Sequence, residues 1–321
     1  MLSRGEYFLI DYIEKIGNFN IDTLDSTFSV EGYHDLYNWS TNELKTKTST
    51  LAKRRTQGQT HGSNKIYDFV FVPNCGFLNS NLPLLNNCEL KLSFDRLNME
   101  VAFMEAGDTG VNSAQTGSPV TIKGCEAITE YIMSDDLEKY FMNIDNGPIP
   151  YYYQECDITI KGLPKDETNI RLDNIKGGDV PVIMFAGIIP TASLSGVISE
   201  SVTAFNCKNV TEFNISLNGN SVNGYPLYNK LLSPVYPFYK FMEATSRYMN
   251  PESGESLKLG QFMHNWVYAH RFEGETSDKG WLGINMKLTE GLADAHSLVI
   301  WCVYDCALTI DKFHQIEKLA L

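Results

Sequence analysis

Histidines are the residues best suited to acid–base or metal chemistry in this chain, and they are widely spaced. The six are His34, His61, His264, His270, His296 and His314. His264 and His270 lie six residues apart in a strand-like run, so both side chains could share one face. Neither has a Cys, Asp or Glu at metal-ligand spacing, and the sequence contains no HExxH motif and no Cys/His finger pattern. We therefore predict no metal site and no bound cofactor.

Motifs for nucleophilic or nucleotide chemistry are missing from the sequence as well. There is no GxSxG elbow, no P-loop and no GxGxxG. Asp294 stands two residues before His296, and Asp135 precedes Asp136, but both pairs lie in segments typical of a loop or a helix cap. An acid–base pair built from distant residues is not detectable in one sequence. We predict no catalytic residue and a protein that is not an enzyme.

The charge balance does not favour phosphate binding, because the chain carries a net charge of −13. Its single basic run, over 45–55, contains Arg54 and Arg55 in a Thr/Gln/Gly-rich stretch. This run is typical of a solvated loop, or else of a contact site for a partner or a genome, so we expect at most weak nucleic-acid contact. No basic-then-apolar leader and no apolar stretch of roughly 18 residues occur, so we expect no secretory signal and no membrane span.

The elements that must position any functional residue in the second half are strands. Alternating or continuous apolar runs predict strands over 151–161, 169–172, 180–189, 210–217, 266–272, 281–288 and 298–310. Asn218-Gly219-Asn220, directly after one of these runs, predicts a hairpin turn. One helix is predicted over 237–248. Many short strands and few helices favour antiparallel β-sandwiches over a parallel α/β sheet.

The domain organisation follows from the length and from a break near the middle of the chain. A chain of 321 residues can bury two separate cores. Ser134 and the acidic pair after it are typical of a helix start, and they predict a linker helix over about 134–146. We place the boundary at this helix, with one domain over 1–146 and a second over 147–321.

Five stretches, taken in order, resemble the major capsid proteins of Polinton/Maverick-type elements and adintovirus-like viruses. They are LLNNCELKLSFDR (84–96), VTIKGCEAITEYIMSDDLEKYF (120–141), VPVIMFAGIIPTASLSG (180–196), FNCKNVTEFNISLNGNSVNGYPL (205–227) and SLVIWCVYDCALTIDK (297–312). The resemblance implies a mainly β double jelly roll, that is, two antiparallel β-sandwiches with few short helices. Family members carry a further segment before the region that matches 7–17. The first sandwich is therefore expected to be incomplete, as in an N-terminally truncated copy, with apolar strand edges uncovered.

The same resemblance implies a structural, self-assembling subunit of a viral or transposon-derived capsid. Three copies would form a pseudo-hexagonal homotrimer that contacts other capsid proteins in the virion, after assembly in the host nucleus or cytoplasm. Such a role needs a rigid core and self-complementary surfaces rather than catalytic residues. The long loops over 38–64, 105–118, 191–206 and 250–260 are candidates for these contacts.

Two groups of single residues are also candidate subunit contacts. Tyr151, Tyr152 and Tyr153 alternate between the two faces of a strand, so at least one should point outward, where a tyrosine suits an interface. Arg54 and Arg55, in the basic run, are the second group.

Three other functions are compatible with this sequence. The chain could be a minor vertex capsid protein, since both capsid roles use jelly rolls. It could be a jelly-roll module that binds carbohydrate or protein, which would need an exposed aromatic platform with polar groups on one sheet. It could also be a cupin-like metal enzyme, which would need two or three histidines with a carboxylate inside one barrel, and the histidines here are dispersed.

Overall fold

The computed structural model describes the second half of the chain in most detail. It covers 147–194, 205, 209–222, 227–228, 235–246, 259–262, 267–272, 279–313 and 315–319, together with 59–61, 64–66 and the single residues Lys15, Gly76, Lys91, Gly124 and Glu126. These residues belong to two compact units, of which one includes Cys156–Val303 and the other includes Thr109–Glu155 and Tyr304–Leu321. Two long strands, described next, run from one unit into the other.

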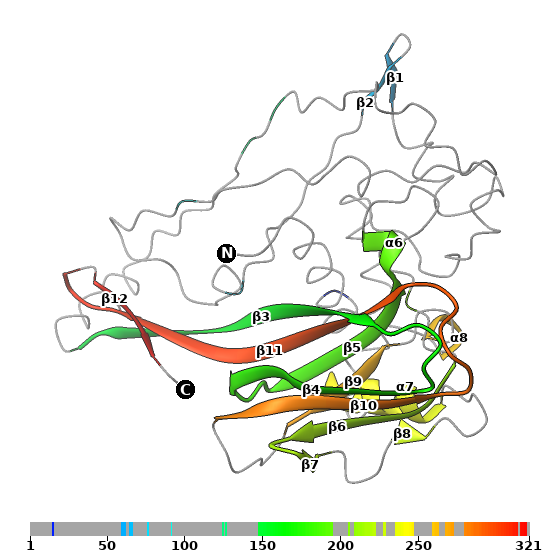
Figure 1. The fold of residues 1–321 in the computed structure, drawn as a ribbon. Coiled ribbons are helices and arrows are strands. Elements are labelled where there is room, and N and C mark those ends of the chain that lie inside the picture. Colours follow the sequence, from blue (N-terminus) through cyan, green and yellow to red (C-terminus); the bar gives the residue numbers. More distant parts are fainter. Residues whose placement is uncertain are drawn as a thin grey trace. The chain divides into compact units, whose positions relative to one another are not determined.

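Eight strands of the second half pair in nested order (Figure 1). They are β3 (Ile149–Leu163), β4 (Asn169–Asp179), β5 (Ile183–Pro190), β6 (Val210–Leu217), β8 (Leu227–Tyr228), β9 (Tyr268–Arg271), β10 (Lys279–Leu288) and β11 (His296–Ile310). The first pairs with the last (β3 with β11), the second with the seventh (β4 with β10), the third with the sixth (β5 with β9) and the fourth with the fifth (β6 with β8). This is the pairing of one long antiparallel hairpin.

Rolling up this hairpin creates two sheets. β10 adds a second partner, β6, and β11 adds β5, which gives the orders β4-β10-β6-β7 and β12-β11-β5-β9, with β8 also on β6 and β3 also on β11. The short strands β7 (Asn220–Ser221) and β12 (Ile316–Leu319) extend these sheets. Figure 1 shows the layer of β4, β10 and β6 against the layer of β3, β11 and β5. Two packed antiparallel sheets with this connectivity form a jelly roll.

The predicted fold class, mainly β with antiparallel sandwiches and few helices, is confirmed. The described helices are short: α6 (Thr191–Leu194), α7 (Val235–Ala244) and α8 (Leu259–Phe262). A two-stranded hairpin, β1 (Gln59–His61) with β2 (Asn64–Ile66), and α6 occur where the sequence predicts loops. The linker helix predicted over 134–146 and most of the first predicted sandwich lie outside the described residues, so the boundary at 146 stays a prediction.

Burial along the strands explains why these segments are extended. Every residue of β5 from Ile183 to Ile189 is buried, because this strand lies between β11 and β9 in one sheet and has both faces covered. β10 alternates in part: Leu282, Ile284 and Met286 are turned into the core, Trp281 and Lys287 on the other face are exposed, and Gly283 is buried. The two patterns differ because the outer face of the β10 sheet is open to solvent.

Aromatic side chains pack on both faces of the sheet that contains β5 and β11: Tyr268 faces the other sheet, whereas Trp301, in register with Phe185, lies on the opposite face. Phe213 of β6 stacks on Tyr268 of β9, with ring centroids 4.2 Å apart. Phe205 meets Trp301 of β11 edge-on at 5.3 Å. Gly187 permits this packing, since a Cβ at that position would lie 2.6 Å from the Phe205 ring.

β4 is longer than predicted, and the difference has a local cause. The sequence predicts a strand over 169–172, because the following DNIKGGD resembles a turn. In the structure Asn174 and Gly178 have positive φ (49° and 121°), and the ladder with β10 shifts register opposite Leu282–Ile284. The turn-type residues therefore form a bulge, and pairing resumes through Asp179.

Removing the aromatic ring of Phe213 tests the inter-sheet packing. Phe213 is fully buried, so Phe213→Ala leaves a cavity between the two sheets, and we expect a loss of about 3 to 5 kcal/mol in the free energy of unfolding. Lys287→Ala on the neighbouring strand is the control, because it removes only an exposed ion pair and should cost less than about 1 kcal/mol. Urea denaturation measures both. Equal losses in the two variants would contradict this packing.

Candidate functional site

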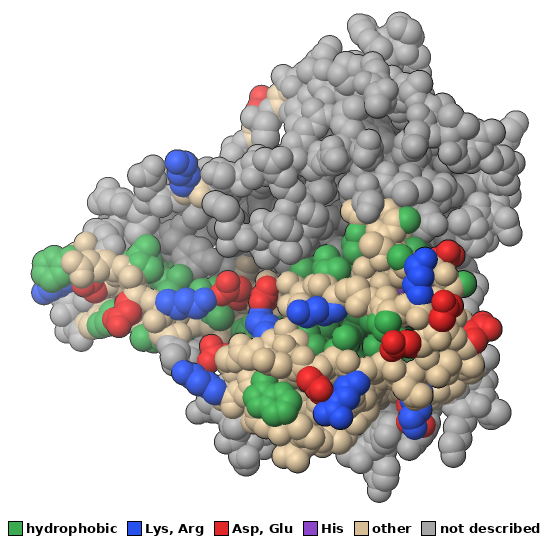
Figure 2. Space-filling view, in the orientation of Figure 1, with side chains coloured by type: hydrophobic (Ala, Val, Ile, Leu, Met, Phe, Trp, Pro, Cys, Tyr) green, Lys and Arg blue, Asp and Glu red, His purple; other side chains and the backbone are tan. Residues whose placement is uncertain are grey.

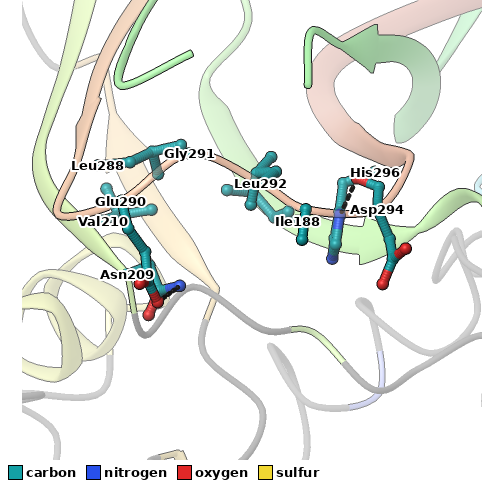
Figure 3. Close-up of a pocket in the computed structure, with 10 residues that line it drawn as sticks. Ile188, Asn209, Val210, Leu288, Glu290, Gly291, Leu292, Asp294 and His296 are labelled. Atoms are coloured by element: carbon teal, nitrogen blue, oxygen red, sulfur yellow. Dashed lines mark hydrogen bonds between the residues drawn. The ribbon is translucent and has the colours of Figure 1, made fainter. Parts of the chain in front are cut away.

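A pocket of about 280 Å³ lies where β10 connects to β11 (Figure 3). Ile188, Val210 and Leu288 supply an apolar wall from three strands. Polar side chains stand at its two ends: Figure 3 shows Asn209 with Glu290 at one end, and Asp294 with His296 at the other.

The hydrogen bonds of this pocket do not assemble an acid–base pair. Asn209 Nδ2 donates to Glu290 Oε1 at 3.3 Å, and the His296 ring nitrogen Nδ1 lies 2.9 Å from the backbone oxygen of Asp294. Within the described part of the chain, no hydrogen bond joins His296 to a carboxylate. Asp294 and His296, which the sequence places close together, therefore meet through the backbone, and this bond fixes the ring rather than activating it.

The other chemical groups singled out in the sequence are only partly covered by the described residues. Among the residues that the structure describes, no group of three His, Cys, Asp or Glu side chains could hold a metal ion. None of the described helices is long and apolar enough to cross a membrane. Arg54, Arg55 and His264 lie outside the described residues.

A second, smaller pocket contains the group with the most unusual environment. About 210 Å³ in volume, it lies between α7 and β9 and is lined by Lys240, Glu243, Ala269, His270 and Arg271. The Arg271 Nε–H donates to the backbone oxygen of Ala244 at 3.0 Å, so a cation caps the C-terminal end of α7. Lys240 forms an ion pair with Glu243 on the same helix.

His270 is the residue that this pocket affects most. Its Nε2 atom is buried without a hydrogen-bond partner among the described residues, and its ring meets Phe272 edge-on at 4.7 Å. Burial, together with the positive charge of Lys240, lowers the pKa of His270 to about 4, although Glu243 acts in the opposite direction. His270 is therefore neutral at neutral pH.

The three candidate tyrosines occupy different environments in β3. Tyr151 is fully buried and Tyr153 is half-buried, whereas 63% of Tyr152 is exposed. The alternation expected from a strand thus turns Tyr152 outward. Its use as a subunit contact stays a prediction.

Further exposed apolar side chains belong to the same compact unit as Tyr152. Phe313 is 71% exposed, Ile316 67% and Leu319 36%, and the last two are part of β12. Lys318 of β12 binds Glu155 of β3 at 2.6 Å, and Asp311 accepts hydrogen bonds from two backbone N–H groups of the turn before β12. β12 is not predicted from the sequence, because IEKL is short, and in the structure it is exposed on both faces.

Comparisons with known proteins yield solved structures only. No family model matches the chain, and no relative is found among curated proteins. The Sputnik virophage structure is 11% identical with a TM-score of 0.33 and matches 54% of this chain and 39% of its own. PBCV-1 VP54, fitted into a reconstruction of the virophage Sputnik, is 10% identical with a TM-score of 0.38 (59% of this chain and 55% of its own).

The mavirus major capsid protein is 8% identical with a TM-score of 0.31, and the match covers 54% of this chain and 41% of that one. The chain thus spans between 39% and 55% of the length of these three proteins. All three TM-scores lie below 0.5.

The environment of His270 predicts an acid-dependent loss of stability. Its folded-state pKa (about 4) lies below the ordinary value of 6.5, so the unfolded chain binds the proton more readily within this window. Stability from this group is complete above pH 6.5 and is lost as the pH falls toward 4, by up to about 3 kcal/mol. Urea unfolding across this pH range measures the loss.

Two variants identify His270 as the source. His270→Gln cannot titrate, so its stability should fall less steeply with acid than that of the wild type. Glu243→Gln removes the carboxylate that raises the pKa of His270, so its loss should be steeper. An unchanged pH dependence in His270→Gln would show that other groups cause the loss.

Proposed function

We propose that this chain is a structural, self-assembling capsid subunit of viral or transposon-derived type. The observation that carries the proposal is the jelly roll built from eight nested strands. Three of the five stretches that resemble Polinton/Maverick-type and adintovirus-like capsid proteins, over 180–196, 205–227 and 297–312, contain the central strands β5, β6 and β11. In this proposal, residues 1–146 belong to a first sandwich.

A shell subunit needs a body that does not deform when its neighbours bind. The described core supports this, because both sheets contribute fully buried aromatic rings, among them Phe213, Tyr268 and Trp301. Close packing of this kind has low compressibility and transmits strain. The two described pockets hold no assembled acid–base pair, and so we assign the function to surfaces instead.

Exposed apolar side chains of the second unit are the proposed self-association surface. Tyr152, Phe313, Ile316 and Leu319 are all exposed, and aromatic and apolar residues are enriched at the buried centres of interfaces. The ion pair between Glu155 and Lys318 joins β3 to β12. Ile316 and Leu319 are three residues apart in β12, so this surface includes both faces of the edge strand. We name these four residues the association surface.

The charges of β12 favour a ring over a twofold dimer. When two identical antiparallel strands pair across a twofold axis, one residue lies opposite its own copy. For β12 that residue would be Glu317 or Lys318, and like charges directly opposite each other destabilise a strand pair. A contact between two different surfaces avoids this repulsion, and such contacts form a ring when the rotation between copies closes. A homotrimer, pseudo-hexagonal if each copy supplies two sandwiches, fits this constraint.

The remaining parts of the proposal follow from a capsid role. The trimer would contact other capsid proteins and reside in the virion, as a major rather than a minor vertex component. Arg54 and Arg55 are proposed as a second contact group.

Self-association in solution tests the proposed function. Sedimentation velocity of the full chain at micromolar concentration should show trimers or larger assemblies. The double variant Tyr152→Ser/Phe313→Ser removes two exposed rings from the association surface, so its dissociation constant should rise roughly tenfold or more.

Trp281→Ser is the matched control, because Trp281 is an exposed aromatic residue of the other unit (41% exposed) and should not affect assembly. A strictly monomeric wild-type chain would count against the capsid proposal. An assembly that is insensitive to the double variant would exclude this surface.

A further inference from the structure

The outward face of the sheet β4-β10-β6-β7 carries one large exposed apolar side chain, Trp281 of β10. Its exposed fraction is 41%, and no other large hydrophobic residue of this sheet is exposed among those whose side chains the structure describes. Figure 2 shows an isolated hydrophobic area of this kind in the region of β4 and β10, surrounded by polar and charged surface. The Trp281 indole is therefore the single large apolar group exposed on a face whose other described side chains are polar or charged.

Glycines leave the indole of Trp281 uncovered. Gly177 lies directly opposite it on β4 and therefore on the same face. Gly283, two residues later on β10, is buried, and the Ser216 Oγ atom lies 2.7 Å from where its Cβ would be. Gly219, in the turn before β7, lies against the ring, since a Cβ there would be 3.4 Å from Cη2 of the indole. Neither Gly177 nor Gly219 has a side chain that could cover the indole, so a flat ligand could reach it.

Hydrogen-bonding groups surround this open ring. The Asn174 Oδ1 atom lies 3.6 Å from where a Cβ of Gly177 would be, which places the amide beside the platform. Asn218 Oδ1 accepts the Trp281 backbone N–H at 3.0 Å, and this bond fixes the turn against the ring. Lys279 and Asp179 are opposite each other one step further along the same face, and both are exposed.

The charges of this face cancel, although the chain as a whole carries −13. Lys287 binds Glu212 at 2.7 Å, and Arg171 Nε donates to both carboxylate oxygens of Asp173 at 2.9 Å. With Lys279 opposite Asp179, the face has three cations and three anions. A neutral face does not attract an ionic ligand over a distance, so the ligand that fits it is neutral.

A sugar ring fits this arrangement better than a protein does. The C–H face of a pyranose is apolar and flat, and it can stack on the negatively polarised face of an indole while its hydroxyl groups bond to nearby amides. A protein interface of ordinary size would place several apolar residues together at its centre. Here a single aromatic residue stands among Asn, Asp, Lys and glycine.

We propose that this face, centred on Trp281 with Asn174, Gly177 and Gly219, binds a neutral saccharide. Trp281 supplies the stacking platform, and Asn174 with the Lys279–Asp179 pair supplies hydrogen bonds to the hydroxyl groups. The site is separate from the association surface, so saccharide binding does not depend on the capsid role. A subunit with both would attach to glycans while it assembles with other copies.

A printed array of neutral and sialylated glycans, probed with the labelled full chain, tests the proposal. Neutral glycans should be bound, and a soluble neutral oligosaccharide chosen from the array is then titrated by calorimetry. Trp281→Ala should raise its dissociation constant roughly tenfold or more, because the stacking platform is lost.

Gly177→Leu is the second variant, since it keeps the indole and covers it. Its Cβ would meet Asn174 at ordinary van der Waals distance, so the fold should tolerate the change while saccharide binding falls to a similar extent. Phe313→Ala, which truncates an exposed ring of the other unit, is the matched control and should bind like the wild type.

Three results would overturn the proposal. The first is an array without any neutral glycan bound, and the second is unchanged affinity in both Trp281→Ala and Gly177→Leu. The third is loss of self-association in Trp281→Ala without any change in saccharide affinity, which would make this face a contact between copies of the chain.

Discussion

The pairing of β5 with β11 is the interaction on which the rest of the structure depends. Eight consecutive residue pairs, from Val303 with Ile183 to His296 with Pro190, join segments that lie more than a hundred residues apart. Because both strands are buried for most of their length, a shift of this register by one residue would turn every core side chain to the other face. The positions of β9, β3 and β12 on the same sheet follow from this pair.

Glycine has two opposite uses in this sandwich, and both depend on the register. Inside the core, Gly187 of β5 leaves room for the Phe205 ring, which in turn packs on Trp301 of β11. On the outer face, the nearest described atom beyond the chain neighbours of Gly177 lies 3.6 Å from where its Cβ would be, and Trp281 opposite it is exposed. Where an aromatic ring lies above a glycine, the absence of a glycine side chain allows dense packing. Where solvent lies above a glycine, the same absence leaves the neighbouring ring exposed.

The described surface has two regions that differ in how their charged and apolar side chains are arranged. On the outer face of the β10 sheet, charges are paired and the single aromatic ring is isolated, which favours a small neutral ligand. In the unit that contains Tyr304–Leu321, four apolar side chains are exposed around one ion pair, which favours another protein surface. The two proposed roles therefore use different residues and can be disrupted separately. Neither requires an acid–base pair or a metal.

Local pattern in the sequence determined which segments are strands. The apolar alternation of VTEFNISL and the Asn-Gly turn after it predicted β6 with its observed bounds, and the continuous apolar runs predicted β5 and β11. The same alternation required an outward residue among the three tyrosines, which is Tyr152. These features depend on neighbours within a few residues, and a strand repeats its environment every second residue.

Only the tertiary structure decided what surrounds each side chain. The residues of β4 after position 172 favour a turn by themselves. They continue the strand because β10 pairs with them. The pKa of His270 falls because α7 covers a ring from a strand more than twenty residues away. Trp281 is exposed because its partner across the ladder, over a hundred positions earlier, is Gly177. Burial and exposure at these sites come from strand register, and register is a property of the whole sheet rather than of any local stretch of sequence.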